Sequence, residues 1–260
     1  LVACSDCELL QLNYTVPKEV MFKKHGYLSG MTKTLRDHFF DIANENVQMF
    51  GLVEDDLVVD IGGNDGTQLL QYEKLGIENL VNIESADNIA EISSNNGIRT
   101  INGFCNEELI RDNFEQGSAR IINAAGVFFH LEELHSVIEG IRYLLADNGV
   151  FTVQCMYAAE LVKNESFDMI YHEHLCYYTL NSLTNLLKPY VLNVFDAYHS
   201  PIHSGSLIVK ICKNEKYQKT KRFHKTAEED SKYDLTAFRR FADKMREKRG
   251  EVRSLLEDIK

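Results

Sequence analysis

The sequence lacks tryptophan, has only 3 prolines and contains no apolar run long enough to cross a bilayer. The missing run argues against a membrane partner, and a formal net charge of −11 argues against a general nucleic-acid binder. No segment has the charged and apolar pattern of an export signal. With mostly isolated cysteines, these absences predict a cytoplasmic protein without a nucleic-acid or membrane partner. They leave the oligomeric state open.

Metal-ligand spacing occurs once among the 6 cysteines. Cys4 and Cys7 are separated by two residues, whereas the other cysteines stand apart as single residues. Two thiolates supply only half of a tetrahedral zinc site. The pair is therefore a candidate for half of a structural zinc site.

Apolar runs alternate with helical patterns through the middle of the chain. The pattern predicts strands at 57–61, 79–84, 100–102, 120–124 and 150–154, with helices at 67–75, 86–95 and 131–145. Such alternation is typical of a parallel sheet with helices on both faces. Two further runs, 191–197 and 206–211, can pair antiparallel at one edge. We therefore expect the α/β, Rossmann-like sheet of class I methyltransferases.

The first predicted strand ends in a glycine turn with the sequence Asp60-Ile61-Gly62-Gly63-Asn64-Asp65-Gly66. Glycines let a backbone approach a ligand closely, but their spacing is not the Gly-x-Gly-x-x-Gly of dinucleotide sites. Acids in the turn suit a cationic amino-acid head better than a diphosphate, and an acid ending the next strand can hold ribose hydroxyls. These features favour S-adenosylmethionine over NAD, although a plain turn with a capping acid is the alternative. The predicted cofactor-binding residues are Asp60, Gly62, Gly63, Asn64, Asp65, Glu84 and Asn102.

A dense group of titratable side chains, Tyr171-His172-Glu173-His174, follows the fifth predicted strand. On a helical turn Tyr171 and His174 share a face, and His172 points elsewhere. An imidazole beside a carboxylate suits proton transfer near neutral pH. A metal site and a buried hydrogen-bonded cluster are the alternatives. His130 lies on the same predicted rim, and His203 is compatible with a simple hairpin turn.

The glycine turn at 60–66, followed later in the chain by the group at 171–174, resembles the pattern of the S-adenosylmethionine-dependent sugar C-methyltransferases. These enzymes act on keto-deoxysugar nucleotides. The similarity runs from Cys4 to about Lys213. Four other motifs carry it: Cys4-Ser5-Asp6-Cys7-Glu8-Leu9-Leu10-Gln11-Leu12, Tyr27-Leu28-Ser29, Thr34-Leu35-Arg36 and His203-Ser204-Gly205-Ser206-Leu207.

The resemblance implies roles for individual residues. His174 would remove a proton from the carbon alpha to the substrate ketone, with Glu173 supporting it. Tyr171, Tyr27 and His130 would line the substrate pocket and help to stabilise the enolate. The methyl group of S-adenosylmethionine would then pass to that carbon without a catalytic metal.

Four segments depart from the family pattern. Ser85 stands where proline is usual, Ala125-Gly126 replaces an Asn pair, Gln154-Cys155-Met156-Tyr157 replaces Glu-Val-Pro-Tyr, and His203-Ser204-Gly205-Ser206 replaces His-Gly-Gly-Ser. The Asn pair, which this chain lacks, is a candidate contact to cofactor or sugar. The change to Gln154 removes an acid. These changes bear on activity more than on fold.

The resemblance also implies a domain organisation. Residues 1–20 would be the remnant of a zinc-binding module, which would hold structural zinc only if its second cysteine pair lies upstream. Residues 21–54 would be a helical lead-in that contributes to the active site. Residues 55–212 would form the S-adenosylmethionine-binding domain, and 213–260 a helical linker to a C-terminal domain absent from this sequence.

Three functions follow from the sequence. The first is C-methylation of a keto-deoxysugar nucleotide, for which Lys33 and Arg36 are diphosphate-binding candidates by position. The second is O- or N-methylation of another small molecule, and the third is a non-catalytic protein that keeps the cofactor pocket.

Overall fold

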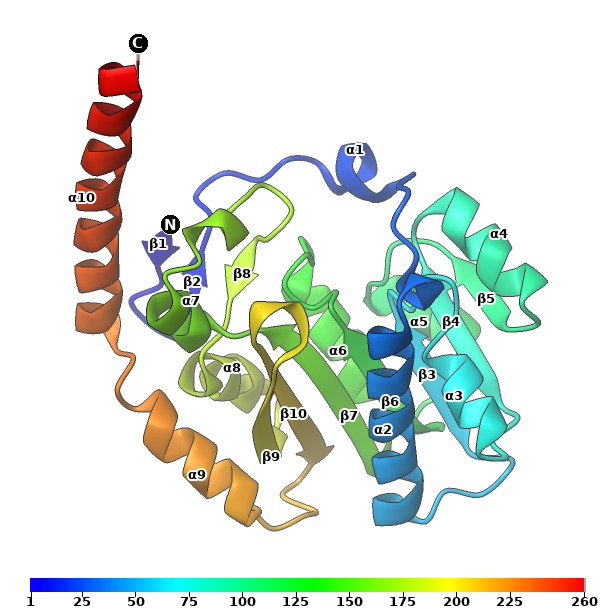
Figure 1. Cartoon of the computed structure of the whole chain (residues 1–260). Coiled ribbons are helices and arrows are strands. Elements are labelled where there is room, and N and C mark those ends of the chain that lie inside the picture. Colours follow the sequence, from blue (N-terminus) through cyan, green and yellow to red (C-terminus); the bar gives the residue numbers. More distant parts are fainter. Residues whose placement is uncertain (260) are drawn as a thin grey trace.

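The computed structural model describes residues 1–259, and its centre is a sheet of seven strands in the order β5-β4-β3-β6-β7-β10-β9 (Figure 1). In chain order these are β3 (Leu57–Ile61), β4 (Leu80–Glu84), β5 (Arg99–Asn102), β6 (Ala119–Ala125), β7 (Leu145–Met156), β9 (Leu192–Ser200) and β10 (Ser206–Lys213). The first five are parallel, and β10 runs antiparallel to both β7 and β9. The predicted parallel sheet with a terminal antiparallel pair is confirmed.

Successive strand residues point to opposite faces, so each apolar strand feeds two hydrophobic cores. Val58 packs with α2 (Lys33–Phe50) and α3 (Leu69–Lys74) on one face. Its neighbour Val59 packs on the other face, with α5 (Glu107–Asn113), α6 (Leu134–Leu144) and α8 (Leu180–Leu187). The helix α4 (Asp87–Asn95) contacts β4 and β5. Helices therefore cover both faces, as the alternation predicted.

Several element boundaries differ from the sequence prediction. The helix expected at 131–145 is shorter (Leu134–Leu144), and β7 begins at Leu145, well before the expected strand at 150–154. The exposed Asp147 and Asn148 lie within β7, whose pairing with β6 shifts register between Ala119 and Ile121. Asp147 and Asn148, residue types that are common in turns, are therefore accommodated in an irregular part of β7.

Residues near the N-terminus join a second, smaller sheet. β1 (Val2–Ala3) pairs with β2 (Leu10–Gln11), and β2 pairs with β8 (Cys176–Tyr177). Leu9 and Leu10 are buried in the core that contains β6 and β7. The strand β8 starts two residues after His174, so this N-terminal segment supports one side of the candidate site.

The C-terminal segment contains two helices. The first, α9 (Lys221–Asp230), packs on β9, where Thr226 Oγ1 donates to the Ala197 carbonyl at 2.9 Å. The second, α10 (Leu235–Ile259), projects from the body and contacts α7 (Ala158–Asn164) (Figure 1). Within the described residues no helix is long and apolar enough to span a membrane.

Candidate functional site

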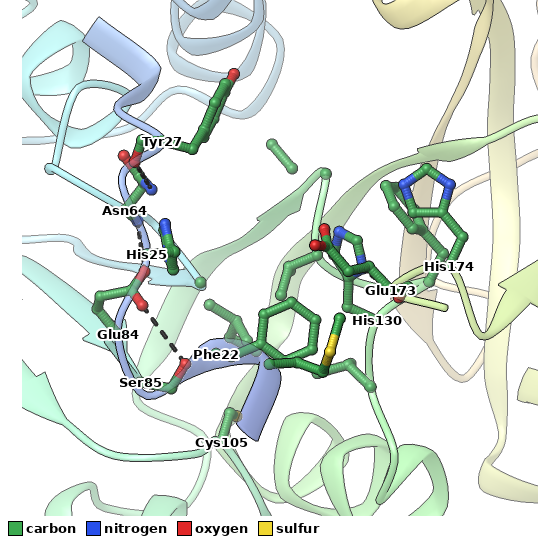
Figure 2. Close-up of a pocket in the computed structure, with 18 of the residues that line it drawn as sticks. Phe22, His25, Tyr27, Asn64, Glu84, Ser85, Cys105, His130, Glu173 and His174 are labelled. Carbon is green, nitrogen blue, oxygen red and sulfur yellow. Dashed lines mark hydrogen bonds between the residues drawn. The ribbon is translucent and has the colours of Figure 1, made fainter. Parts of the chain in front are cut away.

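A cavity of about 720 Å³ opens where the parallel strands end. In open α/β sheets, ligands bind outside these carboxyl ends. Cofactor-loop residues and the turn containing His174 both contribute to the wall, and Figure 2 shows Asn64 and Glu84 facing His130, Glu173 and His174 across the space. The structure therefore brings together the two segments that the sequence singled out.

The cofactor loop follows β3 with a left-handed residue. Gly62 has φ 65°, and a Cβ there would lie 2.6 Å from Val127 Cγ2. Glycine is required for both conformation and space. The Gly62 peptide can therefore form part of the cavity wall beside Val127.

Glu84 is buried at the end of β4, and its carboxylate lies in the cavity wall. One oxygen accepts a hydrogen bond from the Asn64 amide at 3.0 Å, and the other accepts from the Ala86 amide at 2.8 Å. Ser85 Oγ also donates to the oxygen bonded to Ala86, at 3.5 Å, so the three bonds fix the carboxylate and leave a lone pair on the oxygen bonded to Asn64. Glu84 can therefore accept hydrogen bonds from a ligand.

Four other predicted cofactor residues do not belong to the described cavity wall. Asp65 accepts from the Gly30 amide at 2.9 Å, and the Gly63 amide donates to Asn82 Oδ1 at 3.1 Å. Asn102 is exposed and donates to the Glu84 carbonyl at 3.0 Å. Asp60 is buried beneath the loop.

Asp60 is a buried carboxyl group whose Oδ1 makes no hydrogen bond within the described residues. Burial, and secondarily the negative charge of Glu84, raise the pKa of Asp60 to about 8. A water molecule or a cationic ligand group close to Asp60 would satisfy this oxygen. The acids of this region suit an ammonium group and ribose hydroxyls, so the residues fit S-adenosylmethionine.

The lead-in crosses above the cofactor loop and closes the cavity. The helix α1 (Lys18–Phe22) places the Phe22 ring 5.2 Å from the His130 ring. The backbone amide of Lys18 donates to Glu132 Oε2 at 3.2 Å, and the side-chain ammonium of Lys18 pairs with Glu133. Sequence reasoning missed these contacts because α1 spans only 5 residues in a segment of mixed polarity.

His174 is buried, 4% exposed, and lies in the cavity wall. Its Nδ1 lies 2.8 Å from the Met169 carbonyl oxygen, which can only accept, so Nδ1 carries the proton. The second nitrogen, Nε2, therefore holds a free lone pair in the neutral ring. Burial lowers the pKa of His174, and the charge of His203 adds to this effect. Neutral His174 can act as a base.

His130 adopts the same tautomer beside it. Its Nδ1 lies 2.6 Å from the Glu173 carbonyl oxygen, and its ring is 5.2 Å from the His174 ring. Burial lowers the pKa of His130 to about 4. His130 is therefore a weak base, and because its N–H is already used, it accepts rather than donates a hydrogen bond toward the cavity.

The remaining predicted catalytic residues lie at different places around the cavity. The Tyr171 ring is 4.0 Å from the His174 ring, as expected for two residues on one turn. His172 is exposed and contacts Tyr14. Tyr27 is 55% exposed, and its phenol points away from the two imidazoles in Figure 2. The Glu173 carbonyl orients His130, while the Met169 carbonyl orients His174.

The residues that depart from the family pattern line the cavity too. A Cβ on Gly126 would meet no atom within 4 Å, so this wall position is open space. Gln154 Oε1 lies 2.7 Å from His38 Nε2. His38 was not predicted as a site residue, because it is one of several polar residues on α2 and its partner is 116 positions away.

The predicted diphosphate-binding residues lie outside the described cavity wall. Lys33 pairs with Asp37, four residues later on α2. The guanidinium of Arg36 donates to the Gly30 carbonyl. Lys18 is the cation within that wall, and it is paired with Glu133.

Cys4 and Cys7 are free thiols close to one another at the turn between β1 and β2. Hydrogen bonds from the Cys7 and Asp6 backbone amides lower the pKa of Cys4. Burial raises the pKa of Cys7. Among residues 1–259, no group of three or more His, Cys, Asp or Glu side chains is arranged to hold a metal ion.

Comparison with known proteins places this geometry in a family. A family model described as a methyltransferase domain matches residues 35–197. The C-methyltransferase NovU of Streptomyces niveus is 32% identical over 210 residues, which cover 80% of this chain and 50% of NovU. The chain thus spans about half the length of this curated relative.

Solved structures share the fold at low sequence identity. Magnesium protoporphyrin IX methyltransferase from Synechocystis PCC 6803, with bound SAH, has a TM-score of 0.55 and 9% identity, covering 76% of this chain and 93% of its own. A S-adenosylmethionine-dependent methyltransferase from Clostridium acetobutylicum has a TM-score of 0.53 and 11% identity, covering 68% and 92%. With a family model matching more than half of the residues, the chain belongs to the methyltransferase-domain family.

Proposed function

We propose that the protein uses S-adenosylmethionine to methylate a carbon atom alpha to a ketone in a keto-deoxysugar nucleotide. The observation that carries this proposal is the buried, neutral imidazole of His174 in the same cavity as the Glu84 carboxylate. The similarity to a C-methyltransferase supports the choice of carbon as the methyl acceptor.

The cofactor would lie along the cavity side formed by Gly62, Asn64 and Glu84. Glu84 would accept a hydrogen bond from a ribose hydroxyl with the lone pair left on the oxygen that is bonded to the Asn64 amide. The positively charged amino-acid part would lie close to Asp60 and favour loss of its proton, so that the two form an ion pair. When bound, S-adenosylmethionine supplies an electrophilic methyl group.

The opposite side would activate the carbon acid. His174 Nε2 would take the alpha proton, while the Met169 carbonyl holds Nδ1–H and stabilises the imidazolium that forms. The lowered pKa keeps His174 neutral and ready at physiological pH. His130 has a still lower pKa and would accept a hydrogen bond from a substrate hydroxyl.

Negative charge that develops on the ketone oxygen needs a hydrogen-bond donor. Tyr171 lies against His174 and lines the cavity, so its phenol is the candidate nearest to the proposed base. The outward direction of Tyr27 makes its contribution dependent on a rearrangement of the lead-in when substrate binds (Figure 2). Glu173 would act through its backbone carbonyl, which orients His130 beside the base, rather than through its carboxylate.

The sugar-nucleotide part of the proposal rests on family resemblance and on cavity size. A cavity of about 720 Å³ can hold a cofactor together with part of a second small molecule. Lys33 and Arg36 remain diphosphate candidates only if the lead-in moves. Cys4 and Cys7 would contribute two of the four ligands of a structural zinc site.

Methylation of an oxygen or nitrogen atom would not require a base suited to a carbon acid, and a non-catalytic protein would not require His174. The test is transfer of labelled methyl from S-adenosylmethionine to a panel of 4-keto-deoxysugar nucleotides, with the product located by carbon NMR. We expect a new carbon–carbon bond alpha to the ketone. His174→Gln should lower turnover about a hundredfold or more while cofactor binding persists. A methyl group on oxygen or nitrogen would overturn the proposal.

A further inference from the structure

Proton release is an unsolved requirement of the proposed chemistry. His174 would gain one proton in every turnover, yet its side chain is only 4% exposed. Its Nδ1 is held by Met169, and Phe129 and Tyr171 pack around the ring. With substrate in the cavity, direct access of solvent to Nε2 would be narrower still. A second group that can accept this proton is therefore needed.

His203 stands in the wall of the same cavity, on the hairpin between β9 and β10. Unlike His174, it is exposed. Its backbone is left-handed, with φ 52°, a conformation in which His, Asn and Asp are enriched among non-glycine residues. The hairpin thus presents an imidazole that faces the cavity and also reaches solvent.

His38 is a third imidazole next to this cavity. His38 Nε2 lies 2.7 Å from Gln154 Oε1, so Nε2 donates and Nδ1 is free to accept. Gln154 also lines the main cavity. On its other side, His38 lines a second hollow of about 400 Å³ together with Asp41 and Glu45. His38 therefore lies between the main cavity and a separate acidic opening.

His203 interacts electrostatically with His174. Burial, and then the charge of His203, lower the pKa of His174. His174 and His203 line one cavity, and His38 is bonded to Gln154 in its wall, so water in this cavity can connect the three rings.

We propose that His203 accepts the proton from His174 after each deprotonation of substrate and delivers it to solvent, with His38 as a further acceptor. The inference rests on the proposed function. In the transfer, the N–H bond at His174 Nε2 breaks and its electron pair stays on that nitrogen. A new N–H bond forms on His203, directly or through one water molecule, and solvent then removes this proton. His203 acts through His174 and does not touch the methyl group.

The experiment compares the first turnover with steady-state turnover in wild type and His203→Asn. Asparagine tolerates the left-handed backbone but cannot take up the proton. We expect the first methyl transfer to change by less than about twofold, while steady-state turnover falls about tenfold or more. Added imidazole, a small diffusible base, should restore most of the lost rate. His224→Asn on the exposed surface of α9 is the matched control and should keep the wild-type rate in both phases.

The results of this experiment distinguish failure of the relay from failure of the proposed methyl transfer. If wild type transfers no methyl group to carbon in any keto sugar, the proposed function fails and the relay fails with it. If wild type is active and His203→Asn matches it in both phases, the relay alone is wrong. A first turnover that slows as much as the steady state, without rescue by imidazole, would assign His203 to substrate positioning and overturn the relay.

Discussion

The side-chain amide of Asn64 joins the lead-in to the cofactor loop. Its Oδ1 accepts from the Ser29 amide at 2.9 Å, and its Nδ2 donates to the Tyr27 carbonyl at 3.1 Å. Asn64 itself is left-handed, with φ 53°. One side chain therefore holds the segment above the cavity to the turn that would carry the cofactor.

We expect Asn64→Ala to lower the free energy of unfolding by about 2–3 kcal/mol, through two lost hydrogen bonds and a strained backbone. Asn64→Gly loses the same bonds but tolerates positive φ, so it should cost about 1 kcal/mol less. Urea unfolding measures both values. Equal losses in the two variants would show that backbone strain at residue 64 is unimportant.

A second prediction concerns Glu84 and the cofactor. Glu84→Gln removes the negative charge of the group that would accept hydrogen bonds from the ribose hydroxyls. Hydrogen bonds to charged groups contribute about 1.5–3 kcal/mol. We therefore expect S-adenosylmethionine to bind about ten- to a hundredfold more weakly in calorimetric titration. Glu91→Gln, on the exposed face of α4, provides the control and should bind as wild type does. Unchanged affinity in Glu84→Gln would remove Glu84 from the proposed cofactor site.

The sheet could be predicted from sequence because its signal is local. Val58 and Val59 face opposite cores, and both must be apolar in a strand covered on two sides. Parallel strands end at one rim of the sheet. The position of Glu84 at the end of β4 and of His130 shortly after β6, around one cavity, therefore follows from topology. The small sheet was harder, since Leu10 pairs with Tyr177 across most of the chain.

The detailed chemistry of the site could not be predicted in the same way. The tautomers of His174 and His130 are fixed by the carbonyls of Met169 and Glu173, and a backbone carbonyl leaves no trace in side-chain identity. The outward direction of Tyr27 likewise depends on the path of the lead-in. Sequence reasoning therefore found the segments that carry the site but not the bonds that orient it.

The third prediction uses the pH dependence of stability at His130. Its folded-state pKa of about 4 lies below the ordinary value of 6.5, so between these pH values the unfolded chain binds more protons. This contribution to stability is fully present above pH 6.5 and is lost as the pH falls toward 4. Asp60, whose pKa is raised to about 8, acts in the opposite direction, so the effect of His130 must be isolated by substitution.

His130→Gln removes the titrating imidazole and leaves Asp60 in place. From pH 7 to pH 5, we expect wild type to lose about 1–2 kcal/mol of unfolding free energy relative to this variant, after allowance for partial exposure of the ring. Urea unfolding at the two pH values, in wild type, His130→Gln and the exposed control His224→Asn, gives the comparison. The control should follow wild type, since His224 lies on the exposed surface of α9. If wild type and His130→Gln changed in parallel, His130 would be shown to titrate normally, and its assignment as a neutral acceptor beside His174 would be wrong.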